Sequence, residues 1–186
     1  MFDLEEFVAD CRAALKDRSS AAVREVVARA VSESSAVVKA IGEPTRGQIQ
    51  RLYHSPQLTI LNVIWAPKMT IFPHNHDMWA VIGIYSGRED NIFWRRLPTD
   101  AHRVEAAGAK SLCDTDTVQL GRDIIHSVTN PIGRLTGAIH VYGGDFFNAN
   151  RSEWDPGSLQ ERPCDPYRIA QIFEEENYRL QSATQR

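Results

Sequence analysis

Short runs of β-branched and aromatic residues, separated by turn residues, fill the middle of the sequence. They lie at residues 58–65, 78–85, 91–94 and 135–142. Turn signals lie between them at positions 67, 86–87, 98 and 131–133. Many short strands with regular turns and no helical period between them are typical of an all-β sandwich or barrel. The sequence therefore predicts a mainly β fold whose barrel occupies residues 50–150.

Helical periodicity precedes the β-rich region. Residues 2–17 carry an amphipathic pattern, and Asp3 and Glu6 have the spacing of a capping box at its start. Residues 19–41 continue as one helix, or as two helices with a break at Ser34-Ser35. Two alternatives therefore stay open for this second stretch.

A further helix is expected at residues 165–181, with Pro166 in its first turn. The helical residues 1–45 are too few for a good core of their own, since stable cores are rare below about 40 residues. We expect them to pack on the barrel. A chain of 186 residues also suits a single domain, here covering residues 1–186.

Charge, cysteine content and hydropathy argue against several classes of protein. A net charge of −3 argues against a nucleic-acid partner, which requires a clustered basic face. The sequence has three cysteines, an odd number, and they lie far apart at Cys11, Cys113 and Cys164. They predict no disulfide framework and no zinc finger. We therefore expect a reducing, cytoplasmic location. The acidic residues 1–6 and the lack of a long apolar run argue against a secretory signal and a membrane span.

The pair His74 and His76 is the main candidate for a functional site. Side chains alternate along an extended chain, so both imidazoles project from one face, with Cα atoms roughly 6.5–7 Å apart. Both can then bind one cation. A third histidine, His126, opens another strand-like segment and is followed four residues later by Asn130. The sequence predicts that His74, His76 and His126 hold one divalent metal.

These segments resemble the two motifs of the cupin superfamily, H-x-H with a later Gly and then H-x-x-x-N. The resemblance implies a double-stranded β-helix barrel, here with N-terminal helices and a C-terminal helix. The usual first motif also has a Glu three or four residues beyond its second His, where this sequence has Ala80 and Val81. Asp77 is the nearest carboxylate, and strand alternation points it away from His76. An all-histidine site narrows the resemblance to the cysteine dioxygenase family of thiol dioxygenases.

The resemblance covers residues from about 58 to 151 and is strongest with the bacterial members, which include mercaptopropionate dioxygenases. It implies an Fe(II) enzyme that uses O₂ to oxidise the sulfur of a small carboxylated thiol to a sulfinate. Three neutral imidazoles do not compensate the +2 charge of the ion. A substrate that brings a thiolate and a carboxylate carries two negative charges and can compensate it. Zinc could fill the same triad. Two alternatives stay open: a cupin oxygenase acting on a non-thiol chelator such as a diketone, and a non-catalytic metal-binding sensor.

His140 and Tyr142 lie two residues apart and therefore on one face of a strand. In thiol dioxygenases a Ser-x-His-x-Tyr run forms a relay that reaches the substrate. His140 and Tyr142 match its last two members as catalytic residues, while Ala138 stands where the Ser is expected. The alternative is a buried pair satisfied by the backbone. No thioether to Tyr142 is expected, because the family's cysteine position falls near Val81.

An arginine is the natural anchor for the substrate carboxylate, because its guanidinium binds a carboxylate through two parallel hydrogen bonds. Arg151 follows Tyr142 by nine residues and resembles the carboxylate-binding Arg of bacterial mercaptopropionate dioxygenases. In the animal-type enzymes this Arg comes from an earlier segment, near Arg51 and Tyr53 here. We expect residues 143–150 to cover the pocket mouth. The expected partners are a small thiol and O₂, in a monomer or small homo-oligomer.

Overall fold

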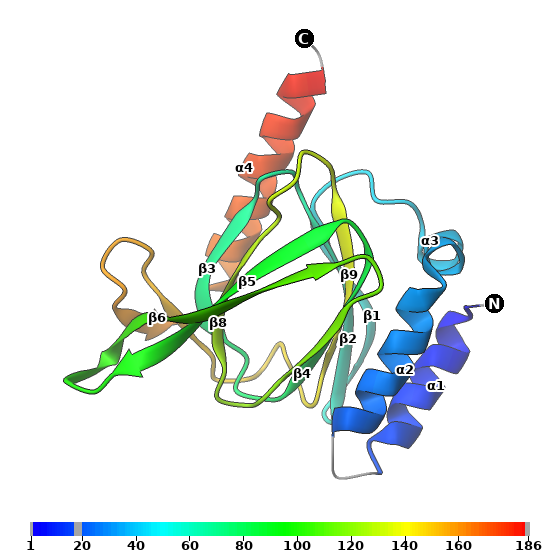
Figure 1. Cartoon of the computed structure of the whole chain (residues 1–186), viewed down its shortest axis with the longest axis horizontal. Helices are drawn as coiled ribbons and strands as arrows, with labels where there is room; N and C mark the ends of the chain where they lie inside the picture. The colour runs from blue at the N-terminus through cyan, green and yellow to red at the C-terminus, as the bar shows by residue number, and fades with distance from the viewer. Residues whose placement is uncertain (1, 17–19, 185–186) are drawn as a thin grey trace.

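Two antiparallel sheets enclose the centre of the protein, in a computed structural model that describes residues 2–16 and 20–184 (Figure 1). The first sheet has the order β1 (Gln48–Ser55), β2 (Leu58–Trp65), β9 (Thr136–Tyr142), β4 (Ala80–Ser86), β7 (Thr117–Leu120). The second has the order β11 (Glu161–Pro163), β10 (Ser152–Trp154), β3 (Thr70–Asn75), β8 (Ile125–Thr129), β5 (Arg88–Leu97), β6 (Asp100–Cys113). The predicted mainly β barrel, with N-terminal helices and a C-terminal helix, is confirmed.

The central strands β2, β4 and β9 are buried along nearly their whole length. One set of their side chains, including Leu61 and Ile82, fills the barrel interior. The alternate set, including Ile60 and Val141, packs under the N-terminal helices. Continuous apolar runs therefore mark these strands, because both of their faces are covered.

The N-terminal helices α1 (Leu4–Ala14), α2 (Ser20–Ser32) and α3 (Ser34–Ile41) cover the outer face of the first sheet (Figure 1). Gly83 in β4 allows α2 to approach closely, because a Cβ there would lie 2.5 Å from a methyl carbon of Val27. The backbone N–H of Glu6 donates to Asp3 Oδ1 at 2.9 Å, which confirms Asp3 as N-cap.

The second predicted helical stretch is two helices, separated at Glu33, one residue before the expected break. Residues 17 and 19, which the sequence prediction included in helices, lie outside the described residues. None of the helices within 2–16 and 20–184 combines the length and apolar character that a membrane span requires.

His74 and the predicted strand 78–85 lie on two different strands, β3 and β4. Pro73 lies inside β3, at an irregularity in its pairing with β8, where a missing N–H is tolerated. The backbone then turns at Asp77, which has a φ of 54°, and β4 begins at Ala80. Gly87, with a φ of 94°, ends this part in the turn predicted there.

The helix α4 (Pro166–Thr184) begins at the predicted proline and packs on the barrel, where Phe173 stacks on Trp65 with ring centroids 5.7 Å apart. The sequence analysis assigned no strand to residues 151–164, where the structure has the short strands β10 and β11. A single β10 pairing joins Glu153 to His74 of β3. The second sheet thus extends to the base of α4.

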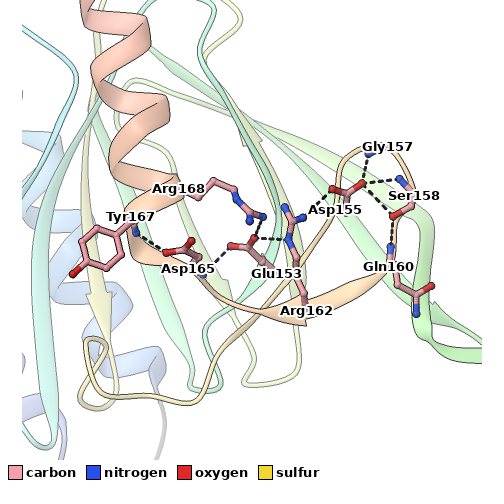
Figure 2. Close-up of polar contacts among 9 residues, drawn as sticks. All are labelled: Glu153, Asp155, Gly157, Ser158, Gln160, Arg162, Asp165, Tyr167 and Arg168. Atoms are coloured by element: carbon pink, nitrogen blue, oxygen red, sulfur yellow. Dashed lines mark hydrogen bonds and ion pairs between the residues drawn. The ribbon is translucent and has the colours of Figure 1, made fainter.

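A buried carboxylate anchors α4 to this sheet edge (Figure 2). Glu153 is completely buried and accepts hydrogen bonds from Arg162 Nε at 2.7 Å and Arg168 Nη1 at 2.5 Å. It also accepts from the backbone N–H of Asp165 at 3.0 Å, just before the helix. The start of α4 is therefore fixed beside the strand that carries His74.

Candidate metal centre

Neighbouring strands bring the three predicted metal ligands together in the barrel interior. His74 in β3 and His126 in β8 are directly opposite one another in the antiparallel pairing, and His76 directly follows β3. One nitrogen from each ring lies within 4.8 Å of one nitrogen from each of the others, and all three side chains are buried. No carboxylate or thiol joins this group within residues 2–16 and 20–184.

The nitrogen positions fit a shared metal ion. His76 Nε2 and His126 Nε2 are 3.2 Å apart. Two imidazoles bound at about 2.0–2.1 Å place their nitrogens about 3.0 Å apart at a right angle and about 3.4 Å apart at a tetrahedral angle. The Nδ1 atoms of His74 and His126 lie 3.0 Å from Phe72 O and 2.7 Å from Asn91 Oδ1, respectively. Because these oxygens only accept, both rings carry their proton on Nδ1 and leave Nε2 free for a metal.

Burial keeps the three imidazoles uncharged. Desolvation lowers the pKa of His74 to about 4, with a further decrease from Arg151. The pKa values of His76 and His126 are lowered well below their ordinary range, first by desolvation and then by neighbouring imidazoles. The site is thus a set of three neutral nitrogen donors at physiological pH.

His140 and Tyr142 of β9 lie beside this triad. His140 Nδ1 is 3.0 Å from the hydroxyl of Tyr142, and the Tyr142 ring packs edge-on against His76, with centroids 4.9 Å apart. Burial raises the pKa of Tyr142, so its hydroxyl stays protonated. The structure thus brings together the metal ligands and the two residues predicted as catalytic; their roles stay predictions.

The two candidate arginines occupy different places. Arg151 lies over the ring of Phe146, with 3.9 Å from guanidinium carbon to ring centroid, and lines the same cavity as the histidines. Its Nε is buried and has no hydrogen-bond partner within the part of the chain that is described. Arg51 is exposed and lies 6.0 Å from the centroid of Phe147, outside the histidine cavity. The geometry therefore favours Arg151 over Arg51 for a ligand next to the metal.

A small inner cavity and a larger outer cavity lead to the triad. The inner cavity has a volume of about 40 Å³ and the outer one about 430 Å³. The outer cavity lies between β1, the 146–151 segment and α4. Residues that line both are Ile49, Phe146, Arg151, Ile169 and Phe173. A ligand that enters by this route passes Arg151.

Sequence reasoning missed Glu89 and Asn91, two buried polar residues of β5 that face the site. Asn91 contacts His126, and Glu89 Oε2 lies 3.5 Å from His140 Nε2. Glu89 lies two residues before Asn91, the first residue of the predicted strand 91–94, and this spacing was the available signal, because polar residues two apart on a strand share a face. Asn130 of the predicted second motif does not reach the triad: its amide donates to three backbone carbonyls, of Trp65, Ala66 and Arg134.

No protein-family model matches the sequence, and no curated protein matches it. Among solved structures, the chain is similar to an RmlC-like cupin family protein with a double-stranded β-helix fold from Methanocaldococcus jannaschii. The two sequences are 10% identical and the TM-score is 0.47. The match covers 57% of this chain and 90% of that one. It is also similar to a protein with a double-stranded β-helix domain from Klebsiella pneumoniae (11% identity, TM-score 0.44, 66% and 90% covered).

A third similar structure is a cupin 2 conserved barrel domain protein from Salinispora arenicola, with 19% identity, a TM-score of 0.40, and coverage of 52% of this chain and 74% of that one. Because these likenesses are weak, any chemistry assigned to this chain rests on its own side chains. Those side chains form a barrel-interior site with three neutral imidazoles that can hold one divalent metal.

Proposed function

We propose that this protein is a non-haem Fe(II)-dependent thiol dioxygenase, which adds both atoms of O₂ to the sulfur of a small carboxylated thiol and gives a sulfinate. The observation that carries the proposal is the buried set of three neutral imidazoles with no carboxylate in it. Such a set leaves the +2 charge of the ion uncompensated, and a substrate that brings a thiolate and a carboxylate compensates it. Bound Fe(II) would supply the redox chemistry, with coordination positions left open for the thiolate and O₂.

We assign Arg151 to the acid end of the substrate. Its guanidinium lies at the junction of the two cavities, and its buried Nε lacks a partner among the described residues. A carboxylate would satisfy that N–H through a charge-assisted hydrogen bond. The thiolate end of a short substrate would then point toward the three histidines.

We assign Tyr142 to a hydrogen bond with the substrate beside His76. Its ring contacts His76, and its hydroxyl is held by His140. Phe146 packs against the Tyr142 ring with centroids 4.3 Å apart, and this contact helps to exclude water from the site. In this assignment Tyr142 is the catalytic residue that contacts substrate, and His140 acts through it.

Replacing Tyr142 by phenylalanine is expected to lower kcat by about 10²-fold, because a positioned hydroxyl contributes about that much to proton transfer or charge stabilisation. The iron content should not change, since neither Tyr142 nor His140 belongs to the triad. Oxygen uptake and iron analysis on the Tyr142→Phe and His140→Gln proteins measure both quantities. Full activity in both variants would contradict the assignment.

Replacing Arg151 by glutamine is expected to raise KM for 3-mercaptopropionate by about 10²-fold. A charge-assisted hydrogen-bonded pair contributes about 3 kcal/mol, and losing it weakens binding by about that factor. Turnover of cysteamine, which has no carboxylate, should change little. Arg51→Gln is the matched control and should leave both substrates unaffected. If Arg51→Gln raises KM instead, the carboxylate is held at the outer position.

Oxygen uptake with a panel of ligands separates this function from its alternatives. The protein is reconstituted with Fe(II) without oxygen and then given cysteine, mercaptopropionate, mercaptosuccinate, cysteamine and a diketone. A thiol dioxygenase consumes one O₂ per thiol, and its product gains the mass of two oxygen atoms. Uptake only with the diketone supports the non-thiol oxygenase, and stoichiometric iron with no uptake supports a sensor.

A further inference from the structure

Glu89 is a completely buried carboxylate at the centre of the polar groups behind the metal site. Trp65 Nε1 donates to its Oε2 at 2.8 Å, and Asn91 Nδ2 donates to its Oε1 at 3.0 Å. His140 Nε2 lies 3.5 Å from Oε2. An ionised carboxylate can only accept hydrogen bonds, so Glu89 fixes the direction of every bond made to it.

The first arm of this network leads to a metal ligand. Because Asn91 directs its NH₂ group to Glu89, its Oδ1 faces His126 Nδ1, 2.7 Å away. That oxygen requires a proton on Nδ1 of His126. The lone pair of His126 is then on Nε2, the nitrogen that lies 3.2 Å from His76 Nε2.

The second arm leads to the tyrosine. His140 Nε2 is buried, and Glu89 Oε2 is the charged group that faces it, since no hydrogen bond to another described residue satisfies this nitrogen. A proton on Nε2 directed at the carboxylate leaves Nδ1 as an acceptor for the Tyr142 hydroxyl, 3.0 Å away. On β9 itself, Ala138 has no hydroxyl to offer His140.

We propose that Glu89 is a positioning residue that sets the tautomers of both His126 and His140, and so prepares the metal ligand and the catalytic tyrosine together. It reaches across the barrel from β5 in the second sheet to β9 in the first. The His140 arm rests on the function proposed above, whereas the His126 arm concerns the binding of any divalent metal at the triad.

The variant Glu89→Gln tests the first arm, because glutamine has the same shape but one of its two polar atoms is a donor. If its oxygen stays with Trp65 and His140, its NH₂ faces the NH₂ of Asn91. Asn91 must then turn over and present a donor to His126 Nδ1. This favours a proton on Nε2 of His126, which blocks metal binding by that nitrogen.

We therefore expect Glu89→Gln to bind Zn(II) about 10–100-fold more weakly, the usual effect of losing a partner of a metal-ligating histidine. The double variant Glu89→Gln/Asn91→Asp should recover most of this affinity, because an aspartate accepts from both neighbours. Zn(II) affinity is measured by competition with a chelator, and circular dichroism checks the fold of each variant. Parent-like affinity in Glu89→Gln, or no recovery in the double variant, would overturn the proposal.

Histidine ¹⁵N shifts of the Zn(II)-loaded parent protein test both arms without any substitution. The expected pattern is a proton on Nδ1 of His126 and on Nε2 of His140. An Nδ1 proton on a neutral His140 would overturn the second arm. Both measurements use neither thiol nor oxygen, so their outcome is separable from failure of the proposed dioxygenase activity.

Discussion

Replacing His126 by alanine is expected to leave a folded protein that retains no stoichiometric iron and consumes no oxygen with thiols. Two imidazoles then remain of three, and the affinity should fall by at least about 10³-fold, well beyond the effect of a residue that only supports a ligand. Iron analysis after anaerobic reconstitution and desalting measures the loss. The substitution also removes the partner of Asn91 Oδ1, which water can replace in the space left by the ring.

His102→Ala is the matched control, because the His102 side chain is 75% exposed and lies in the β5–β6 hairpin, outside the lining of the histidine cavity. It should keep both iron and turnover. His140→Ala should keep iron and lose rate. The division of roles fails if His126→Ala retains iron at the level of the His102 variant.

Replacing Glu153 by alanine is expected to destabilise the fold by about 1–3 kcal/mol, because it removes a completely buried hydrogen-bond acceptor from half-exposed Arg168 and from the backbone N–H of Asp165, while Arg162 keeps its ion pair with Asp155. Glu153 joins Arg162, Arg168 and the backbone N–H of Asp165 (Figure 2). Without it, the start of α4 loses its attachment to β10. Urea unfolding of the metal-free protein measures this change without a contribution from metal binding.

Glu174→Ala provides the comparison on the same helix. Glu174 pairs with Arg46 at 2.7 Å, but its side chain is 71% exposed. Removing such a surface pair should cost less than about 1 kcal/mol. Equal stability of the Glu153 and Glu174 variants would show that the buried network does not fix α4.

The sequence predicted those strands that are covered on both faces. β2 (Leu58–Trp65) was predicted to the residue, because a run of eight buried residues leaves no polar interruption. β6 and β10 were missed for the opposite reason. β6 is mostly exposed and rich in small residues, and β10 has three residues that pair with a strand far away in the sequence.

The candidate triad could be predicted because the spacing of His74 and His76 depends only on local geometry. The residues that hydrogen-bond to the triad and to His140 could not be predicted from the sequence. Glu89 and Asn91 contact groups from three other strands, β2, β8 and β9, and only the closed barrel places them there. Likewise, Phe173 and Ile169 reach the cavity because α4 packs on the barrel, where Phe173 stacks on Trp65 and Glu153 holds the start of the helix.

A crystal structure of the protein with Fe(II) and 3-mercaptopropionate, prepared without oxygen, tests the central claim most directly. Three imidazole nitrogens, from His74, His76 and His126, should bind the ion at about 2.0–2.2 Å, close to the distances usual for imidazole on a divalent metal. The substrate sulfur should also bind the ion, with the carboxylate at Arg151. A protein carboxylate or cysteine bound to the ion, or any of the three rings turned away from it, would contradict the account.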